Sequence, residues 1–263
     1  MENRTKPITS VDILGVRIHQ LTVDSFFHLL TQIIKNQRKA LFACVNVQAI
    51  NLAHEFEWFR QFINNSDYAF CDGAGVVLGA RILGQHLPQR FTSADWMWNL
   101  AEYAESLGFT FYFLGARPGI AEKAALRLRE RYPNLHILGI HHGYFDKTPG
   151  SSENEYVIQV INQYKPNILL VGFGMPLQER WLMENWDRLE VNTAITLGAV
   201  FDYISGELKR SPGWFNKHGM EWLGRLIIEP RRLWKRYLIG NPLYLWRVIR
   251  HRIGLPIKVS KRV

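Results

Sequence analysis

The sequence predicts an α/β protein with an open, mostly parallel sheet, flanking helices and a helical appendage at its C-terminal end. Short apolar runs alternate with amphipathic stretches along most of the 263 residues, which is the pattern of successive β-α-β units. The apolar runs end in glycine-rich or polar loops, as strands do at the ligand-binding edge of such sheets. The expected architecture is therefore Rossmann-like.

The first predicted β-α-β unit lies in the N-terminal third of the chain. An apolar run at residues 40–47 (ALFACVNV) predicts a strand, and the amphipathic segment 48–64 predicts a helix. A second strand at 68–71 leads into the loop 72–75, which holds two glycines, and a helix follows over 76–83.

The rest of the predicted sheet repeats this alternation. Further strands are expected at 109–114, 136–140, 168–172 and 193–197, with helices at 120–132 and 157–164. Several strand ends should therefore meet at one edge of the sheet, and we expect the ligand to bind there.

The C-terminal segment differs from the body in charge. Residues 209–263 carry 14 Lys/Arg and two acidic residues, a net charge of +12, whereas residues 1–208 carry 18 Lys/Arg and 21 acidic residues, a net charge of −3. Its helices are expected to break before Pro230 and Pro242. We therefore expect a catalytic domain over 1–208 and a basic, Trp-rich helical appendage over 209–263.

Composition argues against several classes of protein. Cys44 and Cys71 cannot form a disulfide framework, and no Cys/His spacing is that of a zinc site. The first residues lack the apolar core of a signal peptide, and no stretch approaches the roughly 20 apolar residues of a membrane span. The expected location is the cytoplasm.

Three strand-turn-helix loops, containing Gly73, Gly115 and Gly174, predict phosphate binding. Backbone N–H groups at a helix N-terminus point outward, and glycine lets an anion approach them. The dinucleotide-binding fingerprint is incomplete, because Leu177 stands in for the third glycine of the last loop and Gly79 comes one position late in the first. A nucleotide-sugar dehydrogenase or epimerase is therefore the weaker alternative.

Short motifs follow one another in order along residues 11–240. They read VNV at 45–47, CDGAGV at 71–76, RFTSAD at 90–95, FLGARPG at 113–119, VGFGMPLQE at 171–179, GAVFD at 198–202, KRSP at 209–212, EWLGRL at 221–226 and EPRR at 229–232. This ordered set resembles the WecG/TagA/CpsF glycosyltransferases. Two positions depart from the family pattern, Met175 before a proline and Ala199 in place of a second glycine, and we expect them to affect the size of the sugar rather than the activity.

The resemblance implies an inverting glycosyltransferase of bacterial cell-surface polysaccharide synthesis. Its donor would be a UDP-sugar, carrying N-acetylmannosamine, its uronic acid, glucose or a related hexose. Its acceptor would be a sugar on a polyprenyl diphosphate. Neither a cofactor nor a metal ion would be required.

Asp72 is the residue best suited to act as general base, since inverting transfer requires a group that takes the proton from the acceptor hydroxyl. It follows a strand, and two glycines just after it, Gly73 and Gly75, permit a sugar to approach. The alternative is that Asp72 caps the next helix. Asn46 also ends a strand, and its amide either binds a sugar hydroxyl or pins its own loop.

Two further pairs are candidates for substrate binding. Gln178 and Glu179 lie at the start of a predicted helix, where they could read uracil or ribose, although Glu179 is also a favourable first-turn carboxylate. Arg90 and Asp95 could hold the acceptor loop, or form only a structural ion pair.

The appendage should meet the anionic groups of the substrates and of the membrane. Arg225, Arg232 and Arg236 are expected to neutralise the leaving diphosphate, for which guanidinium groups suit better than ammonium groups. Mixed basic and aromatic residues favour a peripheral site on the inner face of the cytoplasmic membrane. The aromatic and apolar side chains of the appendage, if they form one stripe along its helices, would also fit the core or the interface of a homo-oligomer. A nucleic-acid-binding protein would explain the appendage but not the phosphate loops, so we expect no nucleic-acid partner.

Overall fold

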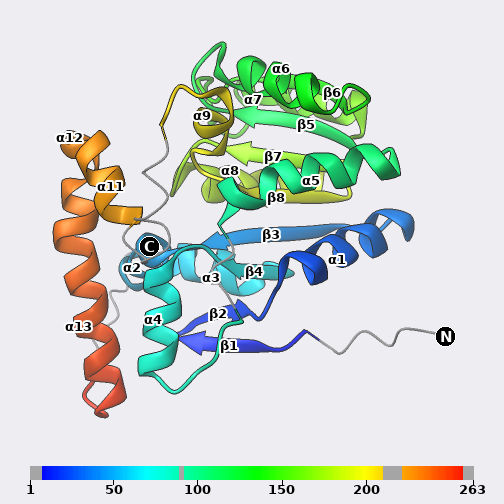
Figure 1. Cartoon of the computed structure of the whole chain (residues 1–263). Helices are drawn as coiled ribbons and strands as arrows, with labels where there is room; N and C mark the ends of the chain where they lie inside the picture. The colour runs from blue at the N-terminus through cyan, green and yellow to red at the C-terminus, as the bar shows by residue number, and fades with distance from the viewer. Residues whose placement is uncertain (1–7, 89–91, 210–220, 257–263) are drawn as a thin grey trace.

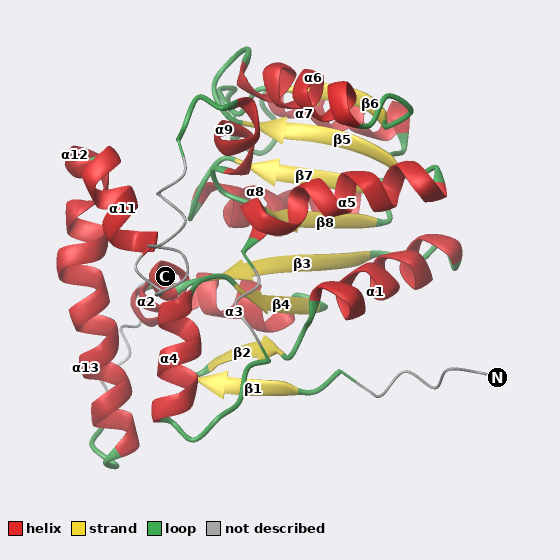
Figure 2. Cartoon of the chain, in the orientation of Figure 1, coloured by secondary structure: helices red, strands yellow, loops and turns green. Residues whose placement is uncertain are grey.

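A computed structural model describes residues 8–88, 92–209 and 221–256. Within them, eight strands form one sheet in the order β1-β2-β4-β3-β8-β7-β5-β6. The strands are β1 (Ser10–Ile13), β2 (Val16–His19), β3 (Ala40–Val45), β4 (Tyr68–Cys71), β5 (Thr110–Gly115), β6 (His136–His141), β7 (Ile168–Gly172) and β8 (Thr193–Thr196). Only β1 and β2 pair antiparallel. The Rossmann-like α/β fold expected from the sequence is confirmed (Figures 1 and 2).

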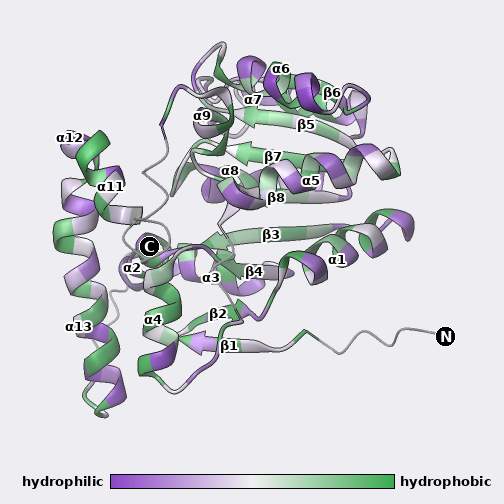
Figure 3. Ribbon diagram, in the orientation of Figure 1, coloured by the Kyte–Doolittle hydropathy of each residue, from purple (hydrophilic) through white to green (hydrophobic). Residues whose placement is uncertain are grey.

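Helices cover both faces of the sheet, each over its own apolar core. One core contains side chains of α1 (Val23–Lys35), α5 (Ser93–Leu107), α6 (Ile120–Arg131) and α9 (Val200–Ser205). The other contains side chains of α2 (Val47–Glu55), α3 (Glu57–Asn65), α4 (Ala74–Ile82), α7 (Ser152–Tyr164) and α8 (Leu177–Asn185), which the short helix η1 (Trp186–Arg188) extends. The central strands are buried on both faces, as parallel strands require, and Figure 3 shows them mainly hydrophobic.

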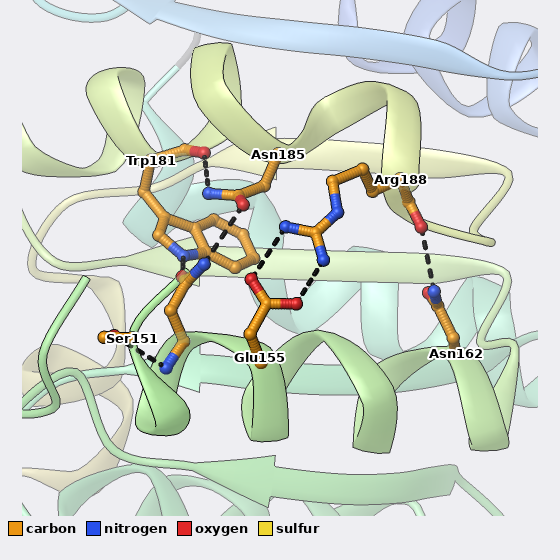
Figure 4. Close-up of polar contacts among 7 residues, drawn as sticks. Ser151, Glu155, Asn162, Trp181, Asn185 and Arg188 are labelled. Atoms are coloured by element: carbon orange, nitrogen blue, oxygen red, sulfur yellow. Dashed lines mark hydrogen bonds and ion pairs between the residues drawn. The ribbon is translucent and has the colours of Figure 1, made fainter. Parts of the chain in front are cut away.

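A buried polar network fixes α8 against α7 (Figure 4). The Trp181 indole donates to Asn154 at 2.7 Å, and the amide of Asn154 donates to Asn185 at 3.2 Å. At the surface, Arg188 pairs with Glu155. Because buried donors and acceptors need partners, this network holds the middle and the end of α8 in one position against α7.

The C-terminal helical region stands across the carboxyl ends of the strands (Figure 1). It consists of α11 (Glu221–Ile228), α12 (Pro230–Trp234), the π-helical turn η2 (Lys235–Ile239) and α13 (Gly240–Arg252). Tyr244 and Val248 of α13 are buried in the core formed with α2 and α4. The helical appendage expected from the sequence is therefore present and is folded back onto the body.

Two predictions about where helices break were wrong. The segment expected as one helix over 48–64 divides at Phe56, whose extended backbone (φ −122°, ψ 119°) ends α2 and begins α3. The break expected before Pro242 is absent, because the chain continues helically from Pro230 to Arg252. The π turn Lys235–Ile239 changes the spacing of the backbone hydrogen bonds just before Pro242, where the proline would otherwise interrupt the helix.

Candidate active site

Two adjoining clefts open at the carboxyl edge of the sheet. The larger, about 910 Å³, lies between the strand ends and the C-terminal helices, and the second, about 840 Å³, lies over β5, β7 and the loop after β6. They share Gly174, Gly198, Ala199 and Arg232 in their linings. A ligand with two parts could therefore occupy both.

The larger cleft lies where strands β3 and β8 separate. Their pairing covers only residues Ala40 to Phe42 of β3, although β3 stays paired with β4 through Val45. Beyond that point the Thr196 hydroxyl accepts a hydrogen bond from the Cys44 backbone N–H at 2.8 Å. The segments after β3 and β8 lead to helices α2 and α9 on opposite faces of the sheet. This is a topological switch point, the usual ligand site of an open α/β sheet.

Asp72 lines this cleft in a half-buried position directly after β4. Its backbone N–H donates to the Val45 carbonyl at 2.7 Å, which extends the β3–β4 ladder by one residue. The helix-capping alternative is wrong, because the N-cap of α4 is Gly73, with a φ of 109°, and no side chain caps this helix. The carboxyl group is therefore left to face the cleft.

The surroundings of Asp72 act on its pKa in opposite directions. Burial raises the pKa, whereas hydrogen bonding by the side chains of Cys44 and Thr92 and the charges of Arg225 and Arg236 lower it. Burial is the largest of these causes. The Cys44 thiol lies 3.4 Å from Oδ2 of Asp72.

Asn46 lines the same cleft and caps α2, since its side chain accepts the Ala49 N–H at 3.1 Å. The loop-pinning role is thus observed. Sugar binding by its amide group stays a prediction.

Gln178 and Glu179 are buried and line neither cleft. The Gln178 side-chain carbonyl accepts the N–H groups of Gly174 and Gly198, at 3.3 and 3.1 Å, so it joins the loops after β7 and β8. Its amide donates to Glu179 Oε1 at 2.7 Å, and burial raises the pKa of Glu179 to about 7. The two residues shape the loops, while direct contact with a nucleotide stays a prediction.

The three predicted arginines reach the larger cleft from the C-terminal helices. Arg225 comes from α11, Arg232 from α12 and Arg236 from η2. The Arg225 guanidinium lies 5.4 Å from the centre of the Tyr203 ring, and Arg232 pairs with Glu229 at 2.6 Å. Asp72 and these arginines, which are about 150 positions apart in sequence, thus line the same cleft.

The second cleft contains cations that the sequence analysis did not single out. Lys147 donates to the carbonyls of Gly143 and Phe145, and its ammonium lies 4.6 Å from the centre of the Phe173 ring. Arg117 pairs with Glu207 at 3.1 Å at the rim. No sequence signal marks Lys147, because it lies in an irregular loop between β6 and α7.

The remaining candidates are the glycines of the three predicted phosphate loops and the pair Arg90 and Asp95. A side chain at Gly115 would meet the carbonyl oxygen of Gly172 at 2.5 Å, so this glycine allows close approach of two strand ends and does not line a cleft. Gly73 and Gly174 do line the larger cleft. Asp95 is exposed in the first turn of α5. Arg90 lies outside the described residues, so the expected pair with Asp95 cannot be placed.

Cys44 and Thr92 are two further lining residues of the larger cleft that the sequence did not single out. Thr92 lies within the 90–95 motif, and Cys44 precedes Asn46 by two positions, so the motifs are the signal that could have found them. In the part of the chain that the structure describes, no group of three or more His, Cys, Asp or Glu side chains could hold a metal ion. The same part contains no helix with the length and apolar character of a membrane span.

A sequence model of the glycosyl transferase WecG/TagA/CpsF family matches residues 11–257. The chain is 29% identical over 240 residues to an N-acetylglucosaminyldiphosphoundecaprenol N-acetyl-beta-D-mannosaminyltransferase of Staphylococcus aureus strain NCTC 8325, covering 90% of this chain and 91% of that protein. The protein of the same description from strain MW2 matches with the same identity and coverage.

Proposed function

Because the chain belongs to the WecG/TagA/CpsF family of glycosyltransferases, we propose that it transfers a hexose-type sugar from a UDP-sugar to a sugar on a polyprenyl diphosphate, with inversion. Its relatives in Staphylococcus aureus are named as N-acetylmannosaminyltransferases that act on an undecaprenyl-diphosphate-linked N-acetylglucosamine. UDP-N-acetylmannosamine is therefore the first donor to test. The product would serve the assembly of a bacterial cell-surface polysaccharide.

The observation that carries this proposal is the half-buried Asp72 carboxylate in the switch-point cleft, close enough to Arg225 and Arg236 for their charges to lower its pKa. In the proposed step, the acceptor hydroxyl oxygen forms a bond to the anomeric carbon, and Asp72 takes the hydroxyl proton. The bond from the anomeric carbon to the UDP oxygen breaks on the opposite face, and UDP leaves with that electron pair.

The charge on the departing diphosphate is met by a helix end and by arginines. Helix α4 begins at the larger cleft with Gly73 as its N-cap, and this N-cap makes no side-chain capping hydrogen bond. Free N–H groups at such an end attract anions. Arg225, Arg232 and Arg236 add full positive charge, and a preorganised charge of this kind stabilises a leaving group without a metal ion.

The two clefts suggest how the donor lies. Arg232, Gly174 and Gly198 are common to both clefts, and we expect the diphosphate to bind at this junction. The nucleoside would then occupy the second cleft, where the Phe173 ring, Lys147 and Asp202 supply an aromatic face and polar groups. The sugar and its acceptor would occupy the larger cleft beside Asp72 and Asn46.

We propose that the C-terminal helices bring the enzyme to the inner face of the membrane. Their outward side exposes Trp234, Leu238, Trp246 and Ile249, between basic residues, and Figure 3 shows both kinds alternating along α13. Lys and Arg near an anionic leaflet contribute about 1 kcal/mol each, and aromatic residues suit the headgroup region.

The test is direct. Purified protein is incubated with a panel of UDP-sugars and a short-chain polyprenyl-diphosphate sugar, with and without EDTA, and the lipid product is weighed by mass spectrometry. A mass increase of one hexose-type residue, unchanged by EDTA, is expected. Absence of any lipid product with every donor would contradict the proposal, and activity that returns only with a divalent metal ion would contradict its metal-free mechanism.

A further inference from the structure

We propose that Cys44 is a positioning residue for Asp72: its thiol donates a hydrogen bond to Oδ2 of the carboxylate and fixes the orientation in which the carboxylate acts as the base. The inference rests on the proposed role of Asp72. It adds Cys44 to the proposed catalytic site, although Cys44 lies outside the sequence motifs and takes no part in the bonds that form or break during transfer.

Sheet geometry brings the two side chains together. Cys44 on β3 is opposite Phe70 on β4, and Asp72 lies two residues after Phe70 on the extension of that strand. Side chains two positions apart on a strand point to the same face, and diagonal neighbours on adjacent strands can touch. The thiol accordingly lies 3.4 Å from Oδ2 of Asp72.

Cys44 cannot move away from this position. The residue is buried, and the Thr196 hydroxyl holds its backbone N–H at 2.8 Å where β3 and β8 separate. Burial and the neighbouring Asp72 both raise the pKa of the Cys44 thiol. The sulfur therefore keeps its proton at neutral pH and serves as a hydrogen-bond donor, not as a second negative charge.

Other described groups also face this pair. Thr92 at the start of α5, Arg225 of α11 and Arg236 of η2 act on Asp72, and Glu179 of α8 acts on Cys44. All but Glu179 favour the ionised carboxylate. Cys44 differs from the arginines because it belongs to the rigid sheet, so it can orient the carboxylate before any substrate or membrane is bound.

The chain supplies a matched control in Cys71. This cysteine is equally buried and directly precedes Asp72, but its thiol faces the opposite core and lies 3.8 Å from the Gly73 carbonyl. Replacing either cysteine by alanine removes one buried thiol, from β3 for Cys44 and from the adjacent strand β4 for Cys71. Only the replacement of Cys44 removes a donor to Asp72.

The test measures the ionisation of Asp72 in the full-length protein. Aspartate is labelled with ¹³C at its carboxyl carbon, the Asp72 signal is assigned by its loss in Asp72→Asn, and its titration is compared in wild type, Cys44→Ala, Cys44→Ser and Cys71→Ala. In Cys44→Ala, the midpoint should rise by about half a pH unit, because a donor to the charged form is lost. Cys44→Ser keeps a donor and should titrate at or below the wild-type midpoint, and Cys71→Ala should match wild type.

Turnover supplies the second readout. The acidic limb of the kcat profile should move to higher pH in Cys44→Ala and return in Cys44→Ser, with the KM for the donor unchanged. An Asp72 midpoint that does not move in Cys44→Ala, or that moves equally in Cys71→Ala, would overturn the inference. Normal turnover in Asp72→Asn would instead overturn the proposed function, whatever the titration shows, so the two failures are distinct.

Discussion

The two walls of the larger cleft are built in different ways. One wall consists of strand ends, where Cys44, Asn46 and Asp72 are fixed by backbone ladders and by a helix cap. The other wall consists of Arg225, Arg232 and Arg236 on the C-terminal helices, whose far side is apolar and exposed.

The attachment of the second wall to the first is local. The Tyr244 ring fills the space above Gly79, where a side chain would meet its hydroxyl oxygen at 1.8 Å. Asn51 of α2 donates to the Gly240 carbonyl at 2.8 Å and accepts from Arg247 at 2.6 Å. The proposed base, Asp72, therefore belongs to the rigid sheet, whereas the arginines proposed to stabilise the leaving group belong to helices docked on it. Variants in the two walls should separate the contribution of the base from that of the arginines.

The largest effect is expected at the strand wall. Asp72→Asn should keep the fold and the binding of UDP but lower kcat by about 100-fold or more, the usual worth of a positioned base. Steady-state kinetics and UDP titration measure both quantities. Asp24→Asn, in the first turn of α1, is the control, and near-normal kcat in Asp72→Asn would remove the functional distinction between the walls.

A smaller loss is expected at the helical wall. Arg236→Ala should lower kcat/KM by about 10- to 100-fold, because it removes one of the charged contacts proposed for the diphosphate. Arg231→Ala, on the same helical segment but outside both clefts, should retain activity with a short-chain acceptor in detergent. Equal losses in the two variants would show that general positive charge, not the cleft, is responsible.

The outer side of the helical wall should act on membrane binding alone. The double variant Trp246→Glu, Ile249→Glu changes two side chains that are each 51% exposed. Its pelleting with anionic vesicles should fall about tenfold, since apolar contact is lost and repulsion is added, while turnover of a short-chain acceptor persists. Leu126→Glu, 60% exposed on α6, should pellet like wild type; unchanged pelleting of the double variant would end the membrane assignment.

The last expected effect concerns stability, not turnover, and lies in the loops behind the strand wall. The pKa of Glu179 is raised from 4.5 to about 7 by burial, so its contribution to stability is complete below pH 4.5 and is lost as the pH rises through about 7. Glu179→Gln mimics the protonated form, and at pH 8 it should be more stable than wild type by about 2 kcal/mol, but not at pH 4.5. Urea unfolding at both pH values measures this, with the exposed Glu190→Gln as control; identical pH dependence in wild type and Glu179→Gln would contradict the raised pKa.

The sequence by itself determined most of the sheet. The strands at 68–71 and 168–172 coincide with β4 and β7, because buried parallel strands are short, continuous apolar runs bounded by turn residues. Strands β1 and β2 were missed, since each has four residues and depends on pairing with its neighbours. The ordered motifs also placed Asn46, Asp72 and Gly174 at the edge where the larger cleft is found.

Only the tertiary structure decided how the parts of the site meet. Thr196 reaches Cys44 across 152 positions of sequence, and Arg236 comes still farther along the chain to act on Asp72. No local pattern encodes these approaches, because they depend on where β3 separates from β8 and on the docking of Tyr244 over Gly79. Local preferences select strands and helices, whereas the packing of whole elements decides which side chains share a cleft.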